Sequence, residues 1–356
     1  MEELPKDAHP TAKAFFSAFD ALDRCNENQE GDFRDNDPKT SSMSESLKRK
    51  SRSLGWRNRN SQCEFYPVTI MQSSDDILED PLSQPTELQS KVGFLRRNFS
   101  VRQVQRGEVE GTYGTGATVW PAAMVLIKYL ERHSMTPGSK VSLRGKQVVE
   151  LGAGTGILSI VATLLGSASV MCTDGEESVV ELSVKNIIRA GHQLSSQLES
   201  SQHESNLGTK IETSYPDCNG TGTNTIINGC PIQGTKYWWG DGTYRKLLRR
   251  TEDNGLVILV ADCVLPKLYP IAPLVQAIDE LISLYQEVKE NREDAFAILS
   301  YEHRYYPEYD PRTEFRRLAS MRSLEVCVVP RSDMDPVYSL EDVEIWIVRR
   351  RVAHSF

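Results

Sequence analysis

Three glycines at alternate positions mark the part of the chain where chemistry is easiest to place. Gly152, Gly154 and Gly156 follow a short apolar segment that contains Glu150, and residues 157–165 can begin a helix. Glycine has no Cβ, so the backbone can turn sharply there and come close to a ligand. A helix N-terminus that faces the same turn adds free N–H groups for a ligand. The pattern predicts a strand, a ligand-binding turn and a helix.

The glycine spacing indicates which ligand the turn could hold. Dinucleotide-binding turns have two residues between the second and third glycines, whereas one residue separates Gly154 from Gly156. Glu150, two residues before Gly152, also departs from that fingerprint. Both differences favour S-adenosylmethionine over NAD as the cofactor. The alternative is a tight strand-to-helix turn that binds nothing.

A carboxylate one strand later supports the cofactor. Residues 168–174 have the pattern of a second strand ending at Asp174, where a carboxylate can accept hydrogen bonds from ribose hydroxyls. Asp174 also precedes a helical run at 176–190, so it could simply cap that helix. The glycine turn and the strand-end carboxylate together favour the cofactor over the cap alone.

The composition limits where a core can form. The chain has 356 residues, a formal net charge of −8 and 39% hydrophobic residues. Residues 1–62 are polar, with acidic, serine-rich and basic stretches, and cannot bury enough apolar surface to offset the entropy of ordering. We expect a largely disordered tail at 1–62. The polar, low-complexity insertion at 193–234 is expected to be a disordered loop or, alternatively, a flap over the substrate groove.

The sequence also predicts a compartment and excludes some partners. No apolar segment is long enough to cross a bilayer, and the N-terminal residues lack the basic start and continuous apolar run of a signal peptide, so no membrane partner is expected. The seven cysteines lack paired metal spacing, which favours a reducing compartment and no metal site. The acidic charge argues against nucleic acid, although a basic stretch at 48–59 could be a nuclear-import signal. We expect a monomer that is cytoplasmic and also nuclear.

Apolar strands and amphipathic helices alternate after the tail. A β element is expected at 63–114, and further strands are expected at 147–151, 169–173, near 236–239, and at 256–261, 295–301, 324–329 and 343–348. Alternation with helices predicts parallel strands and crossover connections, whereas the last pair, joined by a polar turn, must be antiparallel. The expected fold is an α/β, Rossmann-like seven-stranded sheet, mostly parallel with an antiparallel C-terminal strand.

These motifs resemble those of seven-β-strand protein-lysine methyltransferases, a family whose members methylate chaperones, the valosin-containing ATPase and elongation factors. Residues 115–123, the glycine turn after Glu150, the pair Trp239-Gly240 and the strand end Ala261-Asp262 occur in the family's order. The resemblance covers 64–350 apart from the insertion. It implies a methyltransferase domain at 115–356 that uses S-adenosylmethionine and acts on a lysine side chain of a protein substrate.

The resemblance also implies which residues contact the cofactor. Carried over by position, they are Trp120, Gly152, Ala153, Gly154, Asp174, Trp239 and Ala261. An aromatic face attracts a sulfonium cation, which suits the two tryptophans. The backbone from Gly152 to Gly156 can hold the amino-acid portion of the donor. Glu150 could bind polar groups of the donor or hold the loop.

Asp262, after the predicted strand 256–261, is the expected catalytic residue because its carboxylate could orient an amine. In the family this Asp begins a motif with Tyr three positions later, where this chain has Leu265. Tyr269 could replace that Tyr if its loop folds back. His303 lies in another strand-end cluster, which is more typical of a loop-anchoring network than of catalysis.

The sequence therefore predicts an S-adenosylmethionine-dependent protein-lysine N-methyltransferase. One alternative is a methyltransferase for another acceptor, namely histidine, a protein terminus or a small molecule. A second is a catalytically inactive binding module that keeps the methyltransferase fold. A nicotinamide-dependent dehydrogenase is disfavoured by the glycine spacing.

Overall fold

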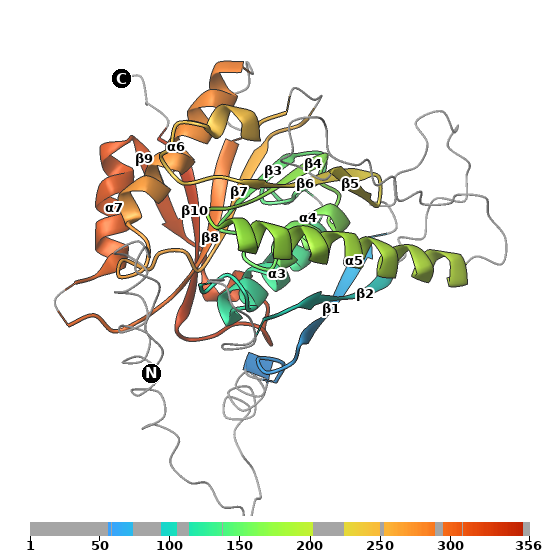
Figure 1. Ribbon diagram of the computed structural model, residues 1–356. Helices are drawn as coiled ribbons and strands as arrows, with labels where there is room; N and C mark the ends of the chain where they lie inside the picture. Colours follow the sequence, from blue (N-terminus) through green and yellow to red (C-terminus); the bar gives the residue numbers. More distant parts are fainter. Residues whose placement is uncertain are drawn as a thin grey trace, which may run out of the picture.

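Figure 1 shows the computed structural model of the chain, in which helices cover both faces of a twisted sheet. The structure describes residues 56–57, 59–73, 94–104, 114–136, 138–201, 224–249, 253–288, 295–307 and 309–351. Most of the predicted tail at 1–62 lies outside the described residues, and so does the middle of the predicted insertion at 193–234.

In the described part of the chain, the main sheet has eight strands in the order β5-β6-β4-β3-β7-β8-β10-β9. Their bounds are β3 Gln147–Leu151, β4 Ser169–Asp174, β5 Asn224–Ile227, β6 Cys230–Lys236, β7 Leu256–Ala261, β8 Ala295–Glu302, β9 Leu324–Val328 and β10 Val343–Arg350. The chain moves outward from β3 in both directions. The order therefore reverses beside β3, between β4 and β7, which is where ligands bind in open α/β sheets.

Most neighbouring strands of this sheet are parallel. β6, β4, β3, β7 and β8 pair in parallel, whereas β10 pairs antiparallel with both β8 and β9. The mostly parallel, Rossmann-like α/β sheet with an antiparallel C-terminal strand is confirmed. The predicted count of seven strands is wrong, because the described residues also contain β5, which pairs antiparallel with β6.

Each face of the sheet has its own apolar core. Val257 and Leu259 of β7 belong to a buried cluster shared with three helices, α3 Pro121–Ser134, α4 Ile157–Leu164 and α5 Glu177–Ser201. Ile258 and Val260 belong to a second cluster with α6 Ile271–Val288 and α7 Pro311–Met321. Successive side chains of a strand point to opposite faces, so one apolar strand supplies both cores.

Short signals set the ends of two of these helices. α3 and α7 each begin with Pro at the first or second helical position, where the missing N–H costs no helical hydrogen bond. The side chain of Asp310 caps α7 by accepting a hydrogen bond from the N–H of Arg312. Two 3₁₀ turns, Tyr244–Leu247 and Arg331–Asp333, lie in the connections.

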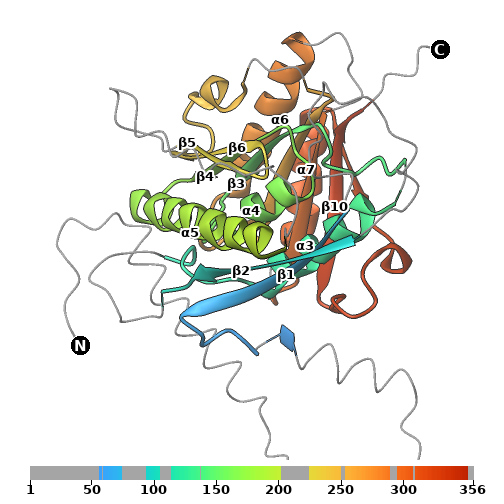
Figure 2. The same cartoon turned by 90° about the vertical axis from the view of Figure 1, so that its right-hand side faces the viewer.

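The predicted β element at the start of the fold is a two-stranded antiparallel ribbon, β1 Phe65–Ser73 and β2 Phe94–Arg102. It lies against α3 and α5 (Figure 2). Side-chain amides of α5 follow β2: the N–H groups of Asn98, Ser100 and Arg102 donate to Gln197, Gln193 and Asn186 over 3.1, 2.8 and 2.7 Å.

The other strand of the ribbon is held by α3. The N–H of Met71 donates to Oε1 of Glu131 over 2.6 Å, and Nζ of Lys128 donates to the carbonyl of Thr69 over 2.7 Å. Helix side chains thus occupy backbone groups on both strands. A two-stranded ribbon is only marginally stable in isolation, so these contacts and its buried face hold it in place.

The polar insertion contains regular structure at both ends. α5 was expected to end near Ala190 but continues to Ser201, because Gln193 and Gln197 have partners on β2. The strand expected near 236–239 instead spans Cys230–Lys236 and pairs with β5 through a tight turn at Asn228-Gly229. Both turn residues have positive φ, 53° and 74°, as two-residue hairpin turns require.

Trp56, which precedes the ribbon, packs against residues near the C-terminal end of the fold. Trp56 is buried, donates through Nε1 to the carbonyl of Val337 over 3.0 Å, and lies 4.9 Å from the ring of Tyr338. Within the described ranges, no helix is both long and apolar enough to cross a membrane.

Candidate functional site

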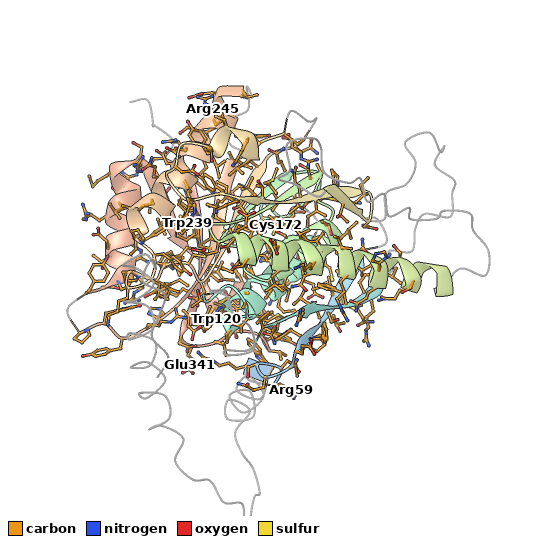
Figure 3. All side chains as sticks on the ribbon, viewed as in Figure 1. Arg59, Trp120, Cys172, Trp239, Arg245 and Glu341 are labelled. Carbon is orange, nitrogen blue, oxygen red and sulfur yellow. The ribbon has the colours of Figure 1, made fainter. Side chains whose placement is uncertain are left out.

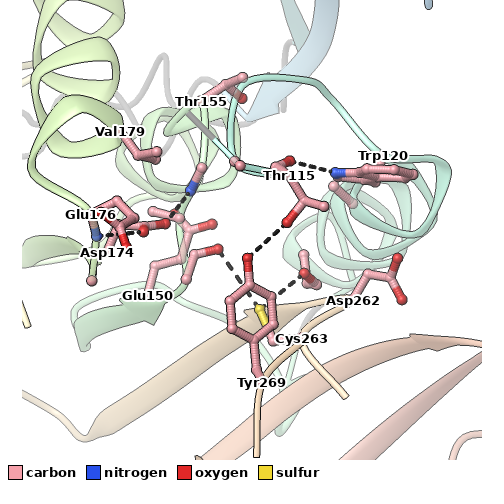
Figure 4. Close-up of a pocket in the computed structure, with 18 of the residues that line it drawn as sticks. Thr115, Trp120, Glu150, Thr155, Asp174, Glu176, Val179, Asp262, Cys263 and Tyr269 are labelled. Carbon is pink, nitrogen blue, oxygen red and sulfur yellow. Dashed lines mark hydrogen bonds between the residues drawn. The ribbon is translucent and has the colours of Figure 1, made fainter. Parts of the chain in front are cut away.

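A cavity opens where β3, β4 and β7 end at their carboxyl termini (Figure 4). All the predicted site residues except Gly156 line it, namely Trp120, Glu150, Gly152, Ala153, Gly154, Asp174, Trp239, Ala261 and Asp262. Trp120 precedes the glycine turn in sequence and Trp239 follows it, and both line this cavity; Figure 3 labels the two side chains. The topology therefore assembles the predicted residues in one place.

Gly152 and Gly154, the first two glycines of the turn, each lie too close to another segment of the chain to carry a side chain. Gly152 and Gly154 have φ of 72° and 56°, in the left-handed region where other residues are strained. A Cβ on Gly154 would lie 2.8 Å from the carbonyl oxygen of Gly116, and one on Gly152 would lie 2.6 Å from Sγ of Cys263. The glycines thus let the turn, the segment 114–120 and the end of β7 converge on the cavity.

Gly156 has a structural position. It has φ of 77°, precedes α4, and would bring a Cβ within 3.0 Å of Cβ of Ser183 on α5. Gly156 is not among the residues that line the cavity. The sequence pattern could not separate it from Gly152 and Gly154, because close packing of two helices requires the same residue as a ligand-binding turn.

Asp174 is held by backbone N–H groups. Its Oδ2 accepts from Gly154 over 3.0 Å and its Oδ1 accepts from Glu176 over 3.2 Å. Burial raises the pKa of Asp174, and these hydrogen bonds oppose that rise. The carboxylate therefore couples the end of β4 to the glycine turn, and it both lines the cavity and accepts from the N–H of the residue before α5.

Glu150 is fully enclosed beneath the turn. Burial raises its pKa to about 8, although a hydrogen bond from the hydroxyl of Ser159 opposes the rise. The carbonyl of Glu150 accepts from Oγ1 of Thr173 over 2.6 Å, which ties β3 to β4. This geometry supports the loop-holding role for Glu150, and the side chain also reaches the cavity.

Tyr269 does fold back into the cavity. The carbonyl of Leu265 accepts from the N–H groups of both Leu268 and Tyr269, each over 2.8 Å, so the segment makes one helical turn. Residues four positions apart share a face in such a turn, which places Tyr269 beside Leu265. The Tyr269 hydroxyl lies 2.8 Å from Oγ1 of Thr115, and its ring packs edge-on to Trp239 at 5.8 Å (Figure 4).

Asp262 is paired with Arg304, which belongs to the same strand-end cluster as His303. Arg304 donates Nη1 to Oδ1 of Asp262 over 2.8 Å and Nη2 to Oδ2 over 2.5 Å, in a two-pronged arrangement. The Asp262 side chain is only 2% exposed, and its φ of 54° is in the left-handed region. A backbone outlier at a strand end beside a cavity is typical of functional sites.

His303 does not join the cavity lining. Its Nε2 lies 2.9 Å from Oε1 of Glu344, and its backbone N–H donates to the carbonyl of Asp342 over 2.7 Å. His303 thus connects the end of β8 to the start of β10. This arrangement agrees with the loop-anchoring interpretation and gives no support to catalysis by His303.

The charge of the cavity lining has a single sign. Among the described residues that line it are the carboxylates Asp174, Glu176 and Asp262 and the carboxyl group of Glu150, whose pKa burial raises to about 8, and none of those lining residues is Lys, Arg or His. The rest of the lining is apolar, aromatic, glycine or hydroxyl-bearing. Such a cavity favours a cationic ligand and disfavours a pyrophosphate.

Comparison with known proteins agrees with this geometry. Residues 102–212 match the lysine methyltransferase family, a range that includes the glycine turn and Asp174. This match covers less than half of the chain. The match bears out the resemblance in the sequence motifs, and it agrees with S-adenosylmethionine as the cofactor.

Individual relatives in this family align with part of the chain. Protein N-lysine methyltransferase METTL21A of Danio rerio is 44% identical over 91 residues, which are 26% of this chain and 37% of that protein. Protein-lysine methyltransferase METTL21E of Mus musculus is 44% identical over 77 residues, 22% of this chain and 29% of that protein. The aligned part of the chain thus spans about a third of the length of these relatives.

A solved structure is similar at a lower level. The ribosomal protein L11 methylase from Lactobacillus delbrueckii subsp. bulgaricus is 15% identical, with 65% of this chain and 77% of that chain covered and a TM-score of 0.33. That score is too low to carry an argument, so the fold rests on the strand order and pairing.

The sequence pattern did not indicate several residues of the cavity. Thr115, Val179, Trp238 and Cys263 line it without having been assigned a role there. Val179 lies in the first turn of α5, five residues after Asp174, so its place follows from the helix N-terminus that the sequence predicted. The ring of Trp238 packs on Gly175, where an added Cβ would lie 3.0 Å from Cδ2 of the ring. No local sequence pattern indicates this contact.

Proposed function

We propose that the protein is an S-adenosylmethionine-dependent methyltransferase that methylates a lysine side chain of another protein. The observation that carries the proposal is the acidic cavity at the carboxyl ends of β3, β4 and β7, lined in its described part by carboxylates without basic side chains. The donor has a sulfonium and an ammonium group against one carboxylate, so it is a net cation, whereas NAD has an anionic pyrophosphate. The family match of residues 102–212 adds the acceptor class.

The residues of the turn fit the donor. The backbone at Gly152 and Gly154 leaves room for its amino-acid portion, because no Cβ enters the cavity there. Asp174 presents a carboxylate that can accept hydrogen bonds from the ribose hydroxyls. Trp120 and Trp239 supply flat aromatic surfaces that attract cations. When bound, the donor supplies a methyl group already activated by its sulfonium.

The chain then has to align a neutral amine with that methyl group and to exclude water. Asp262 can orient the amine although Arg304 occupies one lone pair on each oxygen, because an ionised carboxylate has about four acceptor positions. Leu265 offers an apolar wall beside it, and Tyr269 supplies a phenol one helical turn later. The arrangement suits a lysine whose proton is released to solvent.

Transfer to protein provides the test. The full chain is incubated with radiolabelled S-adenosylmethionine and fractionated cell lysate, and labelled proteins are digested and sequenced by mass spectrometry. We expect label on a lysine side chain, and no label when the matched variant Asp174→Asn replaces the wild type. Label on histidine, on a protein terminus or on a small molecule would overturn the acceptor assignment. Donor binding by calorimetry without any transfer would support the inactive binding module instead.

Location and assembly complete the proposal. A protein acceptor implies an encounter with a folded partner, and the net charge of −8 favours a basic segment around the target lysine. We propose that the chain acts as a monomer in the cytoplasm and also in the nucleus. Size-exclusion chromatography with light scattering and imaging of the tagged full chain would test these two predictions.

A further inference from the structure

Two arginines and three carboxylates form a charge network directly behind the cavity. Arg304 contacts Asp262 with both of its terminal nitrogens, and Nη2 also lies 3.6 Å from Oε2 of Glu302. Glu302 in turn accepts from Nη2 of Arg57, whose Nη1 lies 2.7 Å from Oδ2 of Asp342. The network therefore runs from Arg57, before the first strand of the fold, to Asp262 in the cavity lining.

Most of this network is shielded from solvent. The side chains of Arg57, Glu302, Arg304 and Asp262 are 23%, 13%, 18% and 2% exposed. Burial raises the pKa of Glu302, and the two arginines oppose that rise. Charges in such surroundings interact strongly, and removing one partner leaves the others poorly compensated. Removing a charge at Arg57 therefore changes the electrostatic balance of the ion pair between Arg304 and Asp262.

The position of Arg57 is fixed by its neighbour. Trp56 is buried against Tyr338 and donates to the carbonyl of Val337, so the segment 56–57 is pinned to the connection between β9 and β10. From there Arg57 reaches Glu302 at the end of β8 and Asp342 just before β10. The contacts of Trp56 thus bring Arg57, which lies outside the predicted methyltransferase domain at 115–356, next to the ion pair between Arg304 and Asp262.

We propose that Arg57 is a positioning residue for the acceptor site. By neutralising Glu302, it leaves both terminal nitrogens of Arg304 free to donate to the two carboxylate oxygens of Asp262. This inference rests on the proposed function. Without Arg57, one guanidinium faces two shielded carboxylates, and Arg304 is drawn toward Glu302, 3.6 Å away, at the expense of Asp262. The Asp262 carboxylate then loses its orientation, while the cofactor-facing residues Gly152, Gly154 and Asp174 are untouched.

The test compares Arg57→Met with Arg59→Met in the full chain. Arg59 is two positions away and exposed, and its backbone N–H donates to the carbonyl of Trp56, a bond that any side chain keeps. Its substitution therefore removes the same charge without touching the network. We expect kcat for methyl transfer to fall roughly 10- to 100-fold in Arg57→Met, the cost of misplacing a reacting group, with the donor dissociation constant unchanged. Arg59→Met keeps both values. Arg57→Lys, which restores a cation, recovers part of kcat.

A second readout separates this inference from the proposed function. The side-chain ¹⁵N resonances of Arg304, assigned with Arg304→Lys, report its pairing with Asp262 without any turnover. We expect them to shift in Arg57→Met and to stay in place in Arg59→Met. Unchanged resonances, or an unchanged kcat in Arg57→Met, would overturn the positioning role. A wild-type chain that transfers no methyl group, but whose Arg304 resonances respond as expected, would overturn the proposed function alone.

Discussion

Gly154→Ala should damage both stability and donor binding, and the structure allows the two effects to be separated. The new Cβ would lie 2.8 Å from the carbonyl oxygen of Gly116, inside the distance that real Cβ contacts respect. The φ of 56° adds backbone strain of roughly 1–2 kcal/mol for a residue with a side chain. The forced contact adds about 1–3 kcal/mol, as overpacking does elsewhere.

Gly138→Ala is the matched control. Gly138 has φ of 71°, a Cβ added there would meet no atom within 4 Å, and the residue does not line the cavity. It therefore reports the cost of the backbone conformation alone. We expect Gly154→Ala to lower the free energy of unfolding by about 1–3 kcal/mol more than Gly138→Ala does, measured by denaturant titration.

Donor affinity gives the second half of the comparison. Gly154 and Gly116 both line the cavity, so relief of the contact must move a wall of it. We expect S-adenosylmethionine to bind at least about tenfold more weakly to Gly154→Ala, which corresponds to roughly 1.4 kcal/mol in calorimetry. Gly138→Ala should bind as the wild type does. Equal stability losses in the two variants, with equal donor affinity, would refute the argument that the glycine turn is required by its approach to Gly116.

Three further outcomes are expected. Asp174→Asn should weaken donor binding in calorimetry by about 1.5–3 kcal/mol, because an amide has one acceptor oxygen and no charge; retained affinity would contradict the ribose assignment. The pKa of Glu150 is raised from 4.5 to about 8, so its contribution to stability is present below pH 4.5 and is lost as pH rises through 8. Glu150→Gln should therefore flatten the fall in melting temperature between those pH values, and an unchanged slope would contradict the burial argument. Tyr269→Phe should cost about 0.5–1.5 kcal/mol of stability by freeing Thr115. Burial raises the pKa of Tyr269 to about 12, so the phenol stays protonated over the assay range. The pH–rate profile of Tyr269→Phe should therefore match that of the wild type, and a shifted profile would show that the phenol titrates.

The sequence predicted the parts of the site that depend on local spacing. The turn at Gly152 and Gly154 and the strand-end Asp174 lie where the pattern placed them, because the turn directly follows β3 and Asp174 is the last residue of β4. Parallel pairing of β3 with β4 then brings the turn and the carboxylate together. Local patterns suffice when the topology aligns the carboxyl ends of neighbouring strands.

The partners of Asp262 could not be found in this way. Arg304 is 42 residues away in sequence, and its contact depends on the pairing of β7 with β8 and on the path of the chain after β8. The same holds for Tyr269, whose direction is set by one helical turn between two prolines rather than by a hydrophobic pattern. Pairings of this kind are decided by tertiary structure.

Edge strand β5 was missed for a different reason. Its turn carries Asn228-Gly229, a strong short-range signal for a hairpin, but the surrounding polar composition favoured a loop. The extension of α5 was missed because its last turns are polar, and polar helices are stable only with partners such as those on β2. Composition alone therefore underestimates structure that side-chain amides support.

The ribbon of β1 and β2 has a consequence for how other proteins can approach. Extended segments commonly dock by adding a strand to a free sheet edge, which also makes such edges prone to aggregation. Here Gln193 and Gln197 take up the backbone groups of β2, and Lys128 and Glu131 take up those of β1. An extended peptide therefore cannot pair with the backbone of the ribbon at those positions. Recognition of a partner there has to depend on side-chain contacts and on shape complementarity.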